Sequence, residues 1–158
     1  MKKLFLPLLF LFILSGFSKV EAQSYESAIG ARLGWGFAGS YKHFFSDDLA
    51  GEGIVNFRNY SGLYSYFTVT GLAQKHSAIP DLSGLSWYFG GGAYLGFYGS
   101  GYTGTATIVG IAGNLGLDYA FEDIPLNLSI DWIPRLGLTG GVGFGAESGG
   151  LAARYILN

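Results

Sequence analysis

Apolar and polar positions alternate in steps of two along the chain from about residue 25 onward. In the first such stretch, odd positions carry residues such as Ile29 and Leu33, whereas even positions carry glycine, alanine or a charge such as Arg32. Successive side chains of a β-strand point to opposite faces of a sheet, so each strand has one apolar face and one small or charged face. The alternation therefore predicts β-structure whose two faces meet different surroundings.

Turn-forming residues divide the chain into eight predicted strands. Glycine, proline, aspartate and serine cluster between the alternating stretches, as is typical of turns. The stretches are 25–35, 40–45, 49–58, 64–76, 85–98, 105–121, 126–136 and 150–157. Short strands with one apolar face fit a closed transmembrane barrel, in which every backbone group is paired within the wall. We expect an all-β fold, an eight-stranded antiparallel up-and-down transmembrane β-barrel with a polar, filled lumen.

In each predicted strand, we assign to the inside of the barrel the set of alternate positions that carries most of the charges. A charge on the lipid-facing phase costs about 2–4 kcal/mol at the middle of a membrane. The interior of an eight-stranded barrel is just wide enough for side chains to fill, and buried charges must be paired. We therefore predict a structural polar network in the lumen, with a proton or ion path as the alternative. Its members are Glu26, Arg32, Lys42, Glu52, Arg58, Asp118, Asp131 and Arg154.

Residues 1–22 resemble a secretory signal peptide. Lys2 and Lys3 precede a short apolar run at 4–14, and Ala22 ends a small-residue cleavage pattern. A membrane-spanning helix needs about 20 apolar residues, more than this run supplies. We expect cleavage before Gln23, which leaves one barrel domain at 23–158.

Composition narrows the classes of function. The chain has no cysteine, which excludes disulfides and thiolate metal sites, and we expect no cofactor and no metal. Charged residues make up 13% of the chain, against about 25% in ordinary soluble domains. From residue 23 onward the chain contains six basic and ten acidic residues. A nucleic-acid partner is therefore not expected, because such proteins present a basic face.

Catalytic candidates are few. The chain has two histidines, His43 and His76, and neither lies in a motif with a serine nucleophile and an acid. We expect no catalytic residue, although an outer-membrane enzyme that modifies lipid A stays open as an alternative. A narrow channel also stays open, as does a lipocalin-like carrier of a small ligand, suggested by the string at 33–35. Lipocalins, however, place apolar residues inside their barrels.

Three segments carry a resemblance to a known family. The segments at 28–34, 87–93 and 124–134 are similar to small outer-membrane β-barrels of Gram-negative bacteria, of the OmpX and OmpA-barrel type with short loops. The stretch 148–155 resembles the final strand that the barrel-assembly machinery recognises, with Ala153 in place of an aromatic residue. The resemblance implies an outer-membrane location, lipopolysaccharide and the assembly machinery as partners, and a structural or surface role without catalysis.

Overall fold

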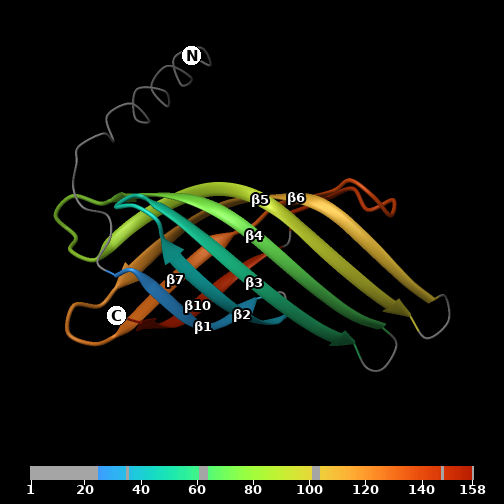
Figure 1. Ribbon diagram of the computed structural model, residues 1–158, viewed down its shortest axis with the longest axis horizontal. Coiled ribbons are helices and arrows are strands. Elements are labelled where there is room, and N and C mark those ends of the chain that lie inside the picture. The colour runs from blue at the N-terminus through green and yellow to red at the C-terminus, as the bar shows by residue number, and fades with distance from the viewer. Residues whose placement is uncertain (1–24, 35, 61–63, 101–103, 147, 158) are drawn as a thin grey trace, which may run out of the picture.

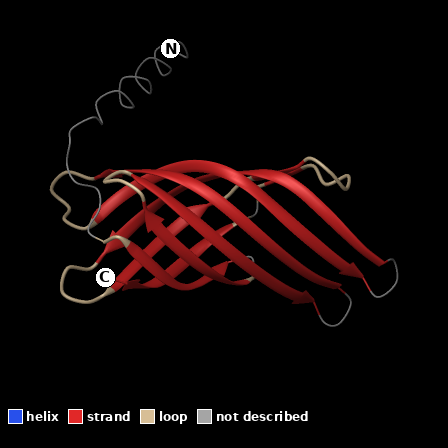
Figure 2. Cartoon of the chain, viewed as in Figure 1, coloured by secondary structure: helices blue, strands red, loops and turns tan. Residues whose placement is uncertain are grey.

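A computed structural model describes residues 25–157 of the chain, apart from 35, 61–63, 101–103 and 147. The predicted signal peptide at 1–22 therefore lies outside the described residues. Within them, regular secondary structure consists of β-strands (Figure 2). No helix in the described part of the chain is long and apolar enough to cross a membrane.

The described residues contain ten strands in one antiparallel sheet. They are β1 (Ser27–Gly34), β2 (Phe37–Phe44), β3 (Leu49–Tyr60), β4 (Tyr64–Ala78), β5 (Leu85–Ser100), β6 (Gly104–Ala120), β7 (Leu126–Trp132), β8 (Arg135–Gly137), β9 (Phe144–Gly145) and β10 (Gly149–Leu157).

Eight of these strands close into a barrel. Strands β1 to β7 pair in sequence, and β10 pairs with both β7 and β1. The closing pair runs from Ser27 opposite Leu157 to Gly34 opposite Gly150. The predicted all-β, eight-stranded antiparallel barrel is thus confirmed, and Figure 1 shows its strands tilted across the long axis.

The seventh predicted strand, 126–136, is interrupted. Strand β7 ends at Trp132, and β8 resumes at Arg135 beside Ala112 of β6. Pro134 lies in the gap, and because proline has no backbone N–H it cannot donate to the sheet. Its carbonyl still accepts a hydrogen bond from the Gly113 nitrogen at 2.8 Å. After the break at Pro134 the chain therefore continues beside β6 as β8. On its other side, β8 pairs with the short β9.

The two ends of the barrel differ in shape. The turn end carries the connections at 45–48, 79–84 and 121–125, and the loop end carries the connections that follow β1, β3, β5 and β8. Strands β3 to β6 have 12, 15, 16 and 17 residues, whereas β1 and β2 have 8 each. The hairpins β3–β4 and β5–β6 consequently project beyond β1, β2, β7 and β10 at the loop end (Figure 1).

The interior is built in three layers, which follow from the order of inward residues along each strand. In β3, buried Ala50, Glu52 and Ile54 occur in that order from the turn end toward the loop end. A turn-end apolar layer comprises Tyr25, Ala28, Phe44, Ala50, Ala120 and Ile156. A loop-end apolar layer comprises Ala38, Ile54, Leu72, Tyr94, Ile108, Ala112 and Ile133. The ionised side chains of the lumen lie between them.

Candidate functional site: the charged lumen and its outer cup

Glu52 lies at the centre of the charged layer and is fully buried. Its carboxylate accepts from Nη1 of Arg32 at 3.1 Å, from Nε2 of Gln74 at 2.7 Å and from the guanidinium of Arg154. Nζ of Lys42 lies 4.0 Å from its second oxygen. One carboxylate from β3 is thus surrounded by partners from β1, β2, β4 and β10, which ties distant parts of the wall together.

Two further carboxylates complete the layer. Asp131 accepts from Nη2 of Arg32 at 2.5 Å and from the hydroxyl of Tyr88 at 2.8 Å. Asp118 accepts from Nζ of Lys42 at 3.0 Å and from the amide of Asn127 at 2.6 Å. Every carboxylate of the layer therefore has a cation and a neutral donor, as burial of a charge requires.

Arg154 is the most fully paired cation. Its Nε donates to the Ser40 hydroxyl at 2.6 Å, and its Nη1 donates to Asn127 at 3.0 Å and Ser129 at 2.8 Å. Its Nη2 binds Glu52. Three cations thus meet three carboxylates, and the layer is neutral overall.

The structure brings six of the eight predicted lumen residues into this network: Arg32, Lys42, Glu52, Asp118, Asp131 and Arg154. Glu26 is instead exposed, because it lies in a bend before β1 where the alternation has not begun. Tyr25, which the alternation places outside, is buried and its hydroxyl donates to Asp118 at 3.2 Å. Arg58 is half-buried and lies beyond the last β2–β3 pair, Phe37 with Phe57, outside the charged layer.

Each of the two histidines contacts a serine. His76 Nδ1 lies 3.3 Å from Ser86 Oγ, and its Nε2 faces the amide oxygen of Gln74 at 3.4 Å. An amide there supplies no negative charge to stabilise an imidazolium. His76 is 1% exposed and stacks on Tyr88, which leaves a substrate no route to the serine. His43 Nδ1 is 2.8 Å from Ser27 Oγ at the turn end of the outer wall.

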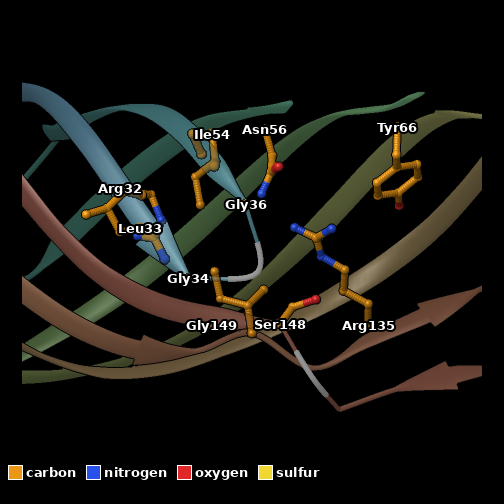
Figure 3. A pocket seen from close by; sticks show the side chains of 12 residues that line it. Arg32, Leu33, Gly34, Gly36, Ile54, Asn56, Tyr66, Arg135, Ser148 and Gly149 are labelled. Atoms are coloured by element: carbon orange, nitrogen blue, oxygen red, sulfur yellow. The ribbon is translucent and has the colours of Figure 1, made fainter. Parts of the chain in front are cut away.

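A small cup opens above the loop-end apolar layer. Its cavity volume is about 30 Å³, enough for about two water molecules, and it opens toward the mouth. Ala38, Ile54 and Ile133 belong both to its lining and to the apolar layer beneath. Figure 3 shows polar side chains that line the cup, among them Asn56, Tyr66, Arg135 and Ser148.

Arg135 is the cup residue that the sequence reasoning missed. Its Nη2 lies 3.4 Å from the Thr70 hydroxyl, and its guanidinium carbon lies 5.2 Å from the centre of the Tyr94 ring. Arg135 shares the odd phase of Asn127 and Asp131, so the alternation could have placed it inside.

The outer wall is apolar and carries a groove of about 450 Å³ over β1, β10, β7 and β6. Small residues create it, because Ala31 lies opposite Ala153 between bulkier neighbours such as Leu33 and Leu151. Many large apolar side chains of the wall are exposed, including Ile130 at 54% and Leu115 at 51%. The amount of apolar surface is far more than a soluble monomer presents.

Comparison with known proteins agrees with this architecture. No family model matches the chain, and neither does any curated protein sequence. The solved structure of Neisserial surface protein A (NspA) is similar, with a TM-score of 0.55 and 16% identity over 83% of this chain and 93% of that one. Ail, the attachment invasion locus protein of Yersinia pestis, matches with a TM-score of 0.47 and 15% identity over 81% and 90%.

The similarity to NspA, a small eight-stranded outer-membrane barrel, confirms for the fold the resemblance that the sequence predicted. At 16% identity, the similarity to NspA concerns the path of the chain and does not transfer any residue's role.

Proposed function

We propose that this protein is an integral outer-membrane β-barrel with a structural or surface role and a lumen closed by its own side chains. The observation that carries the proposal is the pairing of a wholly closed backbone wall with an apolar outer surface. In lipid, a sheet is stable only if no edge is left unpaired, and an exposed apolar wall is stable only if lipid covers it.

The proposed orientation follows from the two ends. The turn end is placed in the periplasm, because barrels of this class extend further on the external side and the hairpins β3–β4 and β5–β6 project from the opposite end. Its connections carry exposed acidic residues such as Asp47 and Glu122, which need water. The projecting hairpins β3–β4 and β5–β6 then reach outward from the cell. The proposed partners are lipopolysaccharide along the wall and the barrel-assembly machinery during insertion.

The interior favours this role over a channel or a carrier. An ion path would have to cross both apolar layers and a neutral, fully paired charged layer. A lipocalin-like carrier needs an apolar cavity inside the barrel, whereas the centre here is filled by arginine, lysine and carboxylate side chains. Lipid A editing would need an accessible nucleophile near the outer leaflet, whereas Ser86 and His76 are buried. The other pair, His43 and Ser27, lies at the turn end, away from that leaflet.

Gel mobility of the detergent-extracted protein, boiled and unboiled, tests the proposal. We expect the unboiled protein from outer-membrane fractions to migrate as a separate band, because a closed wall resists SDS until heated. A soluble periplasmic protein without a heat-dependent shift would overturn the proposal. Lipid A mass spectra from cells with and without the protein test the enzyme alternative, which a shift abolished by His76→Ala would favour.

A further inference from the structure

The guanidinium of Arg135 has hydrogen-bond donors without acceptors. Its Nε atom is buried and has no hydrogen-bond acceptor among the described residues. The guanidinium also contacts the Thr70 hydroxyl at 3.4 Å and the Tyr66 phenol, and the Tyr94 ring lies against it. A guanidinium offers five donors in a rigid fork, so part of the donor capacity of Arg135, including its Nε, is unused.

The cup around Arg135 carries a net positive charge. No carboxylate is present among the described residues that line it. Arg32 also borders the cup, but its charge is matched below by Glu52 and Asp131. The charge of Arg135 therefore faces a hollow whose other polar groups are neutral, namely the Asn56 amide, the Tyr66 phenol and the Ser148 hydroxyl (Figure 3).

The mouth of the cup continues into an aromatic surface. Tyr66 on β4 lies opposite Tyr98 on β5, with ring centres 5.1 Å apart, and Tyr98 is 41% exposed. These rings lie on the inner face of the projecting hairpins, above the closed part of the barrel. A ligand held in the cup would therefore meet flat amphipathic side chains on one side and amide and hydroxyl groups on the other.

We propose that the cup binds an oxyanion, a phosphate or carboxylate group, carried by a sugar. Arginine binds such groups through two parallel hydrogen bonds, which would use the free donors of Arg135. Because the cavity volume of about 30 Å³ admits only the oxyanion, the sugar would lie at the mouth, where its hydroxyl groups would meet Asn56, Ser148 and Tyr66. The anion could belong to a lipid headgroup in the outer leaflet or to a soluble sugar; only this choice of source rests on the proposed membrane orientation.

Calorimetric titration of the purified protein in a polyoxyethylene detergent, which is neutral and contains no sugar, tests the site. The probes are glucose 1-phosphate and glucuronate, with glucose as the neutral reference. We expect saturable binding of at least one anionic probe and none of glucose. Arg135→Gln should weaken that binding at least tenfold. Lys75→Gln is the matched control, because it removes the same charge from an exposed position at the turn end.

Each contrary result is informative. Absence of saturable binding by both anionic probes would overturn the proposal, as would equal weakening by Arg135→Gln and Lys75→Gln, which would indicate bulk charge alone. If Arg135→Gln gives no heat-modifiable band, Arg135→Lys replaces it, since it keeps the charge but loses the fork. Several-fold weaker binding by that variant is expected, and unchanged affinity would overturn the role of Arg135.

The source of the anion is tested separately. Micelles containing lipopolysaccharide should raise the apparent dissociation constant of the anionic probe if a lipid headgroup occupies the cup. An unchanged constant assigns the site to a soluble sugar. The titration reports on the cup in detergent whether or not the protein comes from the outer membrane, so its failure and that of the proposed function are distinguishable.

Discussion

Arg32 on β1 and Asp131 on β7 form an ion pair across the lumen, with 2.5 Å between Nη2 and Oδ1. The second terminal nitrogen of Arg32 binds Glu52, so this one cation joins two carboxylates from different parts of the wall. Both side chains of the pair are buried. Because the three cations and three carboxylates of the layer balance only as a whole, loss of either partner leaves an uncompensated charge away from water.

Replacement of Asp131 by leucine should strongly destabilise the barrel. The change removes one partner of Arg32 and the acceptor of the Tyr88 hydroxyl, at an expected cost of about 3–5 kcal/mol in the free energy of unfolding. Urea unfolding followed by tryptophan fluorescence measures it. Asp123→Leu, at an exposed turn position, should change the free energy of unfolding by no more than about 0.5 kcal/mol. An unchanged midpoint for Asp131→Leu would contradict the network.

Two glycines of one hairpin should respond differently to alanine. A Cβ at Gly92 would overlap the backbone oxygen of Gly71 on the neighbouring strand, whereas nothing lies within 4 Å of a Cβ at Gly71. Gly92→Ala should therefore cost about 1–3 kcal/mol through overpacking, and Gly71→Ala should be nearly neutral. The two variants are compared by the fraction of heat-modifiable protein after refolding. Equal fractions would show that the backbone at Gly92 moves enough to accept a Cβ.

The ion pair between Asp48 and Lys75 at the turn end should make a small contribution that depends on pH. The Lys75 ammonium donates to Asp48 at 2.5 Å and holds the pKa of that carboxyl below its usual value. Since the pKa is lower in the folded state, the contribution is complete above about pH 4 and disappears as pH falls through the folded pKa.

Its size should stay below about 1 kcal/mol, because both side chains are nearly half exposed. The unfolding free energies of wild type and Asp48→Asn, measured from pH 7 downward, should converge in acid and also in about 1 M salt. A difference that grows toward low pH would reverse the expected sign.

Because the interior is layered, we expect no ion conductance by the protein in planar bilayers. Hydrophobic constrictions block ions by excluding water, and the barrel has one on each side of its charged layer. Tyr94→Ala thins the loop-end layer but leaves the turn-end layer complete, so this variant should be silent too. Discrete conductance steps from the wild-type protein would show that the lumen is not sealed.

Alternation alone was enough to predict the closed barrel and to place residues such as Lys42, Asp118 and Arg154 in its interior. The physical reason is that a two-residue period assigns every side chain of a strand to one of two faces. The two-residue period applies only within a strand. Tyr25 and Glu26 precede β1, and for this reason Tyr25 is buried and Glu26 exposed, the reverse of what the alternation predicts.

Other features depend on how strands are displaced along one another. The pairing of Arg154 with Glu52 follows from the stagger of β10 and β3 around the barrel, and a linear pattern contains no such information. The cup likewise arises because β1 and β2 end before β3 to β6 do. Arg135 was overlooked because Pro134 interrupts the strand before it, although the alternation continues across the break.

The position of Arg154 on β10 has a consequence for the order of folding. Strand β10 is the last strand in the chain, yet it supplies the closing pairs with β1 and a cation for Glu52. Until it pairs with β1, the sheet has two free edges and Glu52 lacks the cation of Arg154. Closure should therefore be late and cooperative, with a slow rate typical of contacts between distant parts of a chain.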